Sequence, residues 1–284
     1  MNDQAENLRK MVATEATKEA KVIAVVSGKG GVGKSNVCLN FALSLTRLGK
    51  KVAIFDLDIG MANLDILMGV SSTYTIMDVL ENELSIWDII ENSEDGLAYI
   101  AGGSGFSSFV ELTDSKIHRF FNQLELIGQH FDFVFLDMGA GATKASMQFI
   151  LAANEIFVVT TPEPTSITDA YAMVKYIHLS DEQIPMYLLI NRAESEKEAK
   201  DTEQNFKRVT LQFLGKHLLP LGYVPFDDKV TKSVKSQKPF VLLYPQTKAS
   251  QSIAQMASSY IGIKESTPSK FGQFIKKMKV FMNK

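Results

Sequence analysis

The nine residues SGKGGVGKS at positions 27–35 restrict the fold of this chain more than any other stretch. They follow a short apolar run, KVIAVVS, and precede SNVCLNFALSLTRLG, where apolar residues recur at helical spacing and Gly49 supplies a C-terminal cap. In a strand–loop–helix unit of this kind, glycines let successive backbone N–H groups converge at the positive end of the helix. The stretch therefore predicts a loop that binds phosphate.

The loop matches the Walker A pattern, Gly-x-x-x-x-Gly-Lys-Ser, at residues 28–35. Lys34 is expected to reach the β- and γ-phosphate oxygens of a nucleotide, and the Ser35 hydroxyl is expected to bind Mg²⁺. The alternative is a glycine-rich structural turn, which the full set of motif positions disfavours. The predicted contacts with the nucleotide are Gly28, Lys29, Gly30, Gly31, Val32, Gly33, Lys34, Ser35 and Asn36.

Short β-branched runs alternate with amphipathic helical patterns along most of the chain. Strands that are apolar on both faces and alternate with helices indicate a mostly parallel sheet that is covered on each side. We therefore predict an α/β fold with a single doubly wound sheet, helices on both faces and an amphipathic helix at each end of the chain. The predicted strands are 21–27, 51–56, 97–101, 131–137, 155–160, 186–191 and 219–224.

Acidic residues follow two of these strands. Ligands of open α/β sheets bind outside the carboxyl ends of the strands, so these carboxylates should lie beside the phosphate loop. Asp137 is predicted to bind Mg²⁺ together with Ser35, and Asp58 to position the attacking water and to lie near the metal. Asp56 is either part of this set or a structural hydrogen-bonding residue. The alternative for all three aspartates is a turn or a helix cap.

Composition excludes several other classes of site. The 284 residues carry a net charge of −2, so an affinity for nucleic acid or anionic lipid would need a local basic patch. The single cysteine, Cys38, excludes an internal disulfide and a zinc–thiolate or iron–sulfur cluster ligated by one chain. No apolar run approaches the ~18 residues that a membrane span requires. We expect one ATPase-type domain over 21–262, flanked by segments 1–20 and 263–284.

The segment 263–284 contains an amphipathic pattern. Lysines occupy the face opposite an apolar arc of about 120°, which is typical of a helix that lies in the plane of a membrane surface. The alternatives are a helix that docks on the protein's own core or one that binds a partner protein. The residues predicted to enter an anionic membrane surface are Phe271, Phe274, Ile275, Met278 and Phe281.

The first residues carry a weaker signal. Ala5, Leu8, Met11 and Val12 form one apolar stripe, which is compatible with a helix that binds a groove on a partner. The alternative is a frayed terminus without a role.

The septet KGGVGKS, residues 29–35, resembles the signature of the deviant Walker A ATPases, a family that includes MinD, ParA and the nitrogenase iron protein. The resemblance implies a P-loop NTPase fold that binds ATP or ADP with Mg²⁺. It also implies that Lys29 crosses a two-fold interface to the partner's nucleotide, so that ATP links two subunits in a homodimer. Lys29, Lys34 and Asp58 would then carry a slow, dimerisation-dependent hydrolysis of ATP to ADP and phosphate.

Other stretches resemble the same family. DLDIGMANLDILMG (56–69) is similar to the switch I region of MinD, and DMGAG (137–141) to switch II, with Met138 and Ala140 departing from the commoner residues. TPEPTSITDA (161–170) resembles the loop after the fifth strand. INR and VPFD resemble the two segments that hold the base. This implies base contacts from Asn191, with Arg192, Pro225, Phe226 and Asp227 around the ring.

The stretch DQAENLR, residues 3–9, resembles the N-terminal motif of the FlhG family (also called YlxH or FleN), which regulates flagellar number and placement. The resemblance implies that this segment stimulates the GTPase FlhF through Asp3, Gln4, Ala5, Leu8 and Arg9. It also implies a cytoplasmic protein that binds the inner face of the bacterial membrane reversibly and that contacts basal-body (C-ring) proteins.

Two alternative functions stay open at this point. One is division-site placement of the MinD type, although about 20 residues before the first strand favour FlhG. The other is DNA partitioning of the ParA type, which would need a basic stripe on the core; no specific nucleic acid is expected. Electron transfer of the nitrogenase type is rejected, because it needs two ligating cysteines per subunit.

Overall fold

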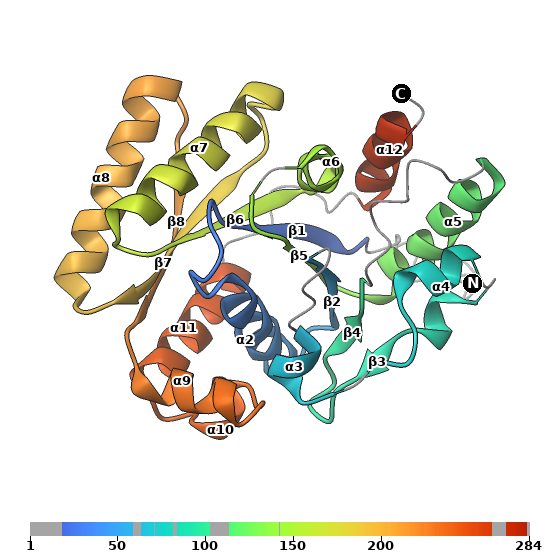
Figure 1. Cartoon of the computed structure of the whole chain (residues 1–284), viewed down its shortest axis with the longest axis horizontal. Helices are drawn as coiled ribbons and strands as arrows, with labels where there is room; N and C mark the ends of the chain where they lie inside the picture. The colour runs from blue at the N-terminus through green and yellow to red at the C-terminus, as the bar shows by residue number, and fades with distance from the viewer. Residues whose placement is uncertain are drawn as a thin grey trace, which may run out of the picture.

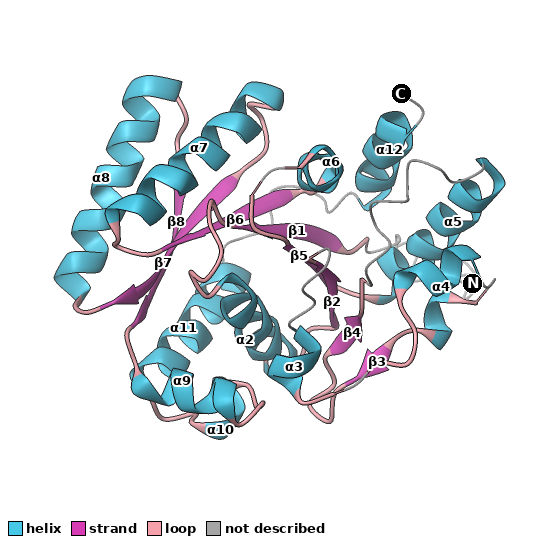
Figure 2. Ribbon diagram, in the orientation of Figure 1, coloured by secondary structure: helices cyan, strands magenta, loops and turns pink. Residues whose placement is uncertain are grey.

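The computed structural model describes residues 19–58, 64–70, 72–81, 84–102, 114–141, 143–262 and 271–282. Within them, one eight-stranded sheet forms the centre of the molecule, with strand order β3-β4-β2-β5-β1-β6-β7-β8 (Figures 1 and 2). All neighbouring strands are parallel except β3 and β4, which are antiparallel. The strands are β1 (Lys21–Val26), β2 (Val52–Leu57), β3 (Glu91–Asn92), β4 (Ala98–Ile100), β5 (Phe133–Met138), β6 (Glu155–Thr160), β7 (Met186–Ala193) and β8 (Leu219–Pro225).

Helices cover both faces of the sheet. The helices are α2 (Lys34–Arg47), α3 (Leu64–Met68), α4 (Ile76–Glu81), η1 (Ile86–Asp88), α5 (Asp114–His130), α6 (Lys144–Ala152), α7 (Pro164–Ser180), α8 (Glu196–Leu214), α9 (Asp228–Lys235), α10 (Phe240–Leu243), α11 (Lys248–Gly262) and α12 (Phe271–Met282). One core packs the sheet against α5, α6, α7, α8 and α12, and the other packs it against α2, α10 and α11 (Figure 1). The predicted doubly wound α/β fold is therefore confirmed.

The central strands are buried on both faces, which explains why they read as continuous apolar runs. In β2, all six residues are buried, and in β1 all but the first. Because β1, β2 and β5 are parallel neighbours, their carboxyl ends lie at one edge of the sheet, where the phosphate loop begins. Among the described residues, no helix has the length and apolarity needed to cross a bilayer.

Candidate functional site

The phosphate loop lies between β1 and α2. Gly33, in a left-handed conformation, precedes α2, and no side chain caps the first backbone N–H groups of that helix. Uncapped N–H groups at a helix start are donors for an anion. A Cβ on Gly28 would lie 2.0 Å from the Asp169 carbonyl carbon, so the loop packs directly on the backbone of α7 and only glycine fits.

Lys34 and Asp137 form the buried centre of this site. The Lys34 Nζ donates to Asp137 Oδ1, and it lies 3.3 Å from the Ser35 hydroxyl. Both side chains are nearly inaccessible, 6% and 1% exposed, so neither charge has water as an alternative partner. A nucleotide phosphate would give Lys34 a new partner and would free the carboxylate.

The residues present fit a Mg²⁺ ion. Asp137 Oδ2 is buried without a hydrogen-bond partner in the described part of the chain. Within that part, no group of three or more His, Cys, Asp or Glu residues is placed to hold a metal. Mg²⁺ is commonly bound by one or two protein ligands plus phosphate and water. Asp137 and Ser35 would hold the ion together with the nucleotide.

The other two aspartates differ in role. Asp56 accepts backbone hydrogen bonds from Asp58 (3.0 Å) and Leu64 (3.3 Å), which fits the alternative of a structural hydrogen-bonding residue. The Asp58 carboxylate faces the switch II backbone, with Oδ1 only 3.0 Å from the position of a Cβ on Gly139. Partial burial raises the pKa of Asp58. Asp58 and Asp137 therefore approach the phosphate loop from two neighbouring strands.

The Asp56 carboxyl gives the free protein a pH-dependent stability. Burial, followed by the charge of Asp137, raises its pKa to about 6 from 3.8. Because the folded-state pKa lies above the unfolded value, the group stabilises the fold fully below about pH 4, and that contribution is lost as the pH rises through 6. A shift of this size corresponds to ~3 kcal/mol.

We predict that Asp56→Asn removes this dependence. As the pH rises from 4.5 to 7, the unfolding free energy of the variant should increase by ~2 kcal/mol relative to that of wild type. Urea unfolding of the two nucleotide-free proteins at several pH values measures this change. A loss of stability that is the same at every pH cancels, because only the change with pH is compared. Parallel pH profiles for the two proteins would contradict the assignment.

A cavity of about 370 Å³ adjoins the phosphate loop, and the residues predicted to contact the base line it. Gly33, Asn36, Asn191, Arg192, Pro225, Phe226 and Asp227 all line it. The Asn191 Nδ2 donates one of its two N–H groups to the Val32 carbonyl (2.7 Å), which fixes the orientation of the amide and identifies Oδ1 as its acceptor. An acceptor at this position suits the exocyclic amine of adenine better than the oxygen of guanine.

The Lys29 side chain points away from the phosphate loop to which it belongs. Its Nζ donates to Glu163 Oε2 (2.8 Å) and to Thr165 Oγ1 (2.9 Å), at the start of α7. The Lys29 side chain is 30% exposed, and the hydrogen bond from Lys29 lowers the pKa of Glu163. The pair lies at the solvent-accessible margin of the site, where a second molecule could reach it.

The helix α12 departs from its prediction. Four of the residues expected to enter a membrane are buried in the core shared with α5 and α6, at 1–3% exposure, and Phe281 is half-buried. A Cβ on Gly128 would lie 2.3 Å from the Phe271 ring, so α5 has a gap that fits this ring. The structure has the arrangement that the sequence left open as an alternative, a helix docked on the protein's own core, and membrane binding stays a prediction. The four residues are Phe271, Phe274, Ile275 and Met278.

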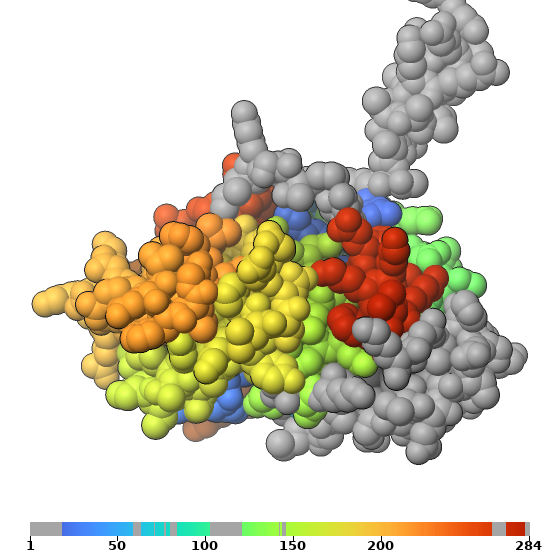
Figure 3. All heavy atoms as spheres, turned by 90° about the horizontal axis from the view of Figure 1, so that it is seen from above, coloured from blue at the N-terminus to red at the C-terminus, as the bar shows by residue number. Residues whose placement is uncertain are grey.

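Two lysines of α12, Lys277 and Lys279, have partners on the core, so the lysine-rich face of the helix is compatible with docking. Lys277 Nζ donates to the Leu151 carbonyl (3.0 Å) and to Asp181 (3.1 Å). Lys279 pairs with Glu125 at 3.5 Å. Figure 3 shows α12, in red, lying flush with the surface of the molecule.

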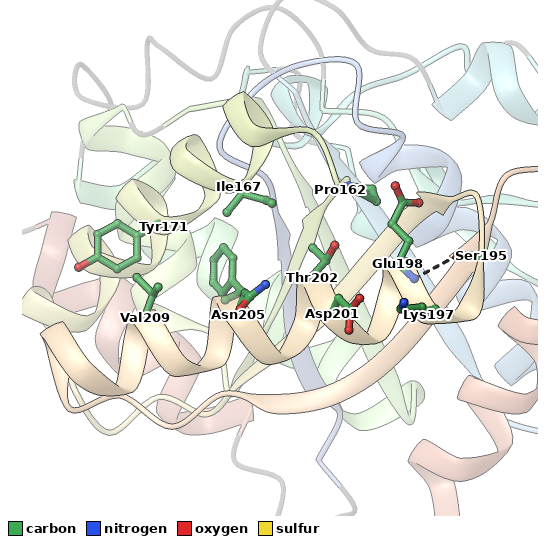
Figure 4. Close-up of a pocket in the computed structure, with 11 residues that line it drawn as sticks. Pro162, Ile167, Tyr171, Ser195, Lys197, Glu198, Asp201, Thr202, Asn205 and Val209 are labelled. Carbon is green, nitrogen blue, oxygen red and sulfur yellow. Dashed lines mark hydrogen bonds between the residues drawn. The ribbon is translucent and has the colours of Figure 1, made fainter.

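A groove of about 480 Å³ lies between α7 and α8, apart from the phosphate loop (Figure 4). Apolar residues such as Ile167, Tyr171 and Phe206 line its floor, while Lys197 and Asp201 are exposed at its margin. No buried charged group points into it, so we assign the nucleotide to the loop and the adjoining base cavity.

Sequence patterns did not identify every residue of the site. The sequence carries no signal for the contacts of Glu163 and Thr165 with Lys29 or of Gly128 with Phe271, although 161–170 resembles a loop of the family. The residues predicted to bind a partner, Asp3, Gln4, Ala5, Leu8 and Arg9, lie outside the described residues.

Comparison with known proteins agrees with this geometry. Residues 18–261 match the ParA family model described as "NUBPL iron-transfer P-loop NTPase". The fold and the phosphate loop define a P-loop NTPase, and the chain belongs to this ParA/MinD family of ATPases. The iron-transfer role named in that description is not carried to this chain, whose single cysteine, Cys38, is buried.

The similar proteins include flagellar regulators. The chain is 35% identical to "Antiactivator FleN" of Pseudomonas aeruginosa over 84% of this chain and 87% of that protein. It is 34% identical to "Flagellum site-determining protein YlxH" of Helicobacter pylori, over 90% of each. Among solved structures, MinD in the MinC:MinD cell division complex of Aquifex aeolicus matches with a TM-score of 0.70 and 27% identity, over 88% of this chain and 99% of that one. The predicted resemblance to the MinD and FlhG group is confirmed.

Proposed function

We propose that this protein is an ATP-hydrolysing switch that forms an ATP-linked homodimer and controls the number or placement of flagella. The observation that carries the proposal is Lys29, a lysine of the phosphate loop that turns away from its own loop to the solvent-accessible start of α7. The similarity to FleN and YlxH supports the flagellar assignment.

In the proposed mechanism, Lys34 moves its ammonium from Asp137 to the β- and γ-phosphate oxygens. Asp137 and Ser35 would hold Mg²⁺, which when bound would neutralise the charge that develops on the phosphate. Asp58 orients the attacking water from the neighbouring strand. The loop N–H groups and α2 bind the phosphates, and Asn191 accepts a hydrogen bond from the adenine amine.

Lys29 completes the site of the other subunit. In the single chain it is held by Glu163 and Thr165, outside the pocket of its own nucleotide. A cation that reaches the transferring phosphoryl group from a second molecule acts as an arginine finger does. Pairing of two ATP-bound subunits would therefore be required for hydrolysis.

This requirement gives a direct test of the function. ATP turnover per subunit should rise with protein concentration and then level off as pairing becomes complete, whereas the turnover of a self-sufficient enzyme is constant. Turnover per subunit that does not change over a hundredfold range of concentration, down to nanomolar protein, would contradict the proposal.

The membrane part of the proposal needs α12 to leave its groove. Docked, it hides the side chains that would enter a bilayer; released, its apolar face and lysines suit an anionic surface. One such helix is a weak anchor, but two on one dimer gain an avidity factor on the order of 10²–10⁴. Liposome sedimentation with ADP and with ATP measures this, and equal binding in both states would contradict it.

The N-terminal segment is proposed to stimulate the GTPase FlhF, on the strength of DQAENLR. A synthetic peptide of residues 1–18 should raise FlhF turnover, and one with Gln4→Ala should not.

Division-site placement of the MinD type is the alternative, supported by the structural match to MinD. A strain that lacks the protein separates the two by whether flagella or division sites are misplaced.

We predict that Asp58→Ala uncouples pairing from turnover. Without the carboxylate that positions water, hydrolysis should fall by at least ~10²-fold, while ATP binding and the contribution of Lys29 persist. The variant should remain dimeric and bound to liposomes in ATP, the hydrolysable nucleotide, for as long as ATP is present. A variant that stays monomeric in ATP would show that Asp58 serves assembly instead of water positioning.

A further inference from the structure

Asn40 carries a buried amide in the second turn of α2, with 0% exposure. Its Nδ2 donates both to the Asn36 carbonyl and to Asn36 Oδ1, each at 2.8 Å. Its Oδ1 accepts the backbone N–H of Val241 at 3.0 Å. All of these partners are protein atoms, so Asn40 does not itself touch a ligand.

The orientation of this amide follows from its partners. A backbone N–H only donates and a backbone carbonyl only accepts, so Val241 requires the Asn40 oxygen and the Asn36 carbonyl requires the Asn40 NH₂. That NH₂ group also faces the Asn36 side chain, which must therefore present its own oxygen. The Asn36 NH₂ is left as the donor for other groups.

Asn36 is half-buried and lines the base cavity. We propose that Asn40 is a positioning residue that fixes the Asn36 amide with its NH₂ toward the nucleotide. The group recognised is a hydrogen-bond acceptor on the nucleoside part of the nucleotide, such as a ribose or ring-nitrogen atom. The proposal rests on the nucleotide assignment of the proposed function, but not on pairing or hydrolysis.

The same amide fixes the wall of the cavity. Val241 follows Phe240, which lines the cavity from α10, and the carbonyl of Val241 accepts a hydrogen bond from Arg47 Nη1 (2.9 Å) at the end of α2. Asn40 therefore bonds the backbone N–H of Val241, and Arg47 bonds its carbonyl. The phosphate-binding helix and the base-cavity wall are joined as one unit.

The test is Asn40→Asp in the full chain. The new carboxylate keeps an acceptor for Val241, but it would draw the Asn36 NH₂ toward itself and turn the Asn36 oxygen to the cavity. The dissociation constant of MgADP, measured by calorimetry, should rise about tenfold, the effect expected when a ligand hydrogen bond is lost. Inorganic pyrophosphate, which lacks the ribose and the base, should bind the variant within about twofold of its affinity for wild type. Equal weakening of both probes would overturn the proposal.

Two further variants make the result specific. Asn36→Ala should raise the dissociation constant of MgADP but not that of pyrophosphate. In the Asn36→Ala background, Asn40→Asp should not change the ratio of these two dissociation constants further, because its effect passes through Asn36. Ser44→Ala removes a buried hydroxyl that donates to the Asn40 carbonyl (2.8 Å), and it should leave the ratio unchanged. Additive effects, or an Asn36→Ala variant with unchanged MgADP affinity, would overturn the proposal even if Asn40→Asp fails to fold. Because ADP binding is measured on single subunits, a failure of the dimer proposal would leave this result intact.

Discussion

Replacement of Lys29 by alanine is expected to reduce ATP turnover by at least ~10³-fold, the lower end of what a cation supplied in trans contributes to phosphoryl transfer. Affinity for ATP in the single chain should change little, because Lys29 bonds Glu163 and Thr165 and not the loop that holds the nucleotide. Steady-state turnover and nucleotide titration measure the two quantities. Lys175→Ala, which removes an exposed lysine of α7, is the matched control for charge.

Mixing two inactive variants sharpens this prediction. Lys29→Ala retains Asp58, and Asp58→Ala retains Lys29, so the mixed dimer has one complete site. Combined in equal amounts, the two proteins should recover a measurable fraction of wild-type turnover, which neither shows alone. No recovery in the mixture, or a large loss of ATP affinity in Lys29→Ala, would show that the lysine serves its own pocket.

Replacement of Gly128 by alanine is expected to release α12. A Cβ at this position would lie 2.3 Å from the Phe271 ring, so the ring must leave the gap in α5 and lose a burial worth ~1.5–3 kcal/mol. Alanine also raises helix propensity by ~1 kcal/mol, so α5 itself should not weaken. Hydrogen exchange in α12 should accelerate by at least about tenfold. Liposome binding should rise above the wild-type level in ADP, while ATP still adds the avidity of the dimer.

The neighbouring exposed residue gives the control. Gln129→Ala makes a similar substitution on the outer side of α5, and it should change neither exchange nor liposome binding. Unchanged protection of α12 in Gly128→Ala would contradict the docking account. If α12 is released but the variant still does not bind liposomes, the result would contradict the membrane function and would leave the account of docking unaffected.

The sheet was largely predictable, because each of its longer strands is indicated by a short run of consecutive residues. Seven runs of apolar, β-branched residues predicted seven strands, and β1, β2, β4, β5, β6, β7 and β8 lie at those runs. The edge strand β3 was not predicted, since two polar residues, Glu91 and Asn92, carry no periodic pattern. The phosphate loop was predictable for the same reason: its chemistry lies within eight consecutive residues.

Contacts between distant residues were not predictable. The periodicity of α12 predicted its apolar face correctly, but it could not show that Gly128 leaves room for Phe271 or that Asp181 pairs with Lys277. The partner of Lys29 is 134 residues away in the sequence. A pattern identifies which face of an element is apolar or charged, whereas the identity of the group that covers it depends on the tertiary fold.

The mass of the protein in solution tests the central claim most directly, because the account makes ATP the link between two subunits. Light scattering during size exclusion, with Mg²⁺ and either ADP or a non-hydrolysable ATP analogue, measures that mass. We predict the 31.5 kDa of one chain in ADP, twice that mass with the analogue, and one chain in both states for Lys29→Ala. A wild-type mass of one chain at saturating analogue would contradict the account.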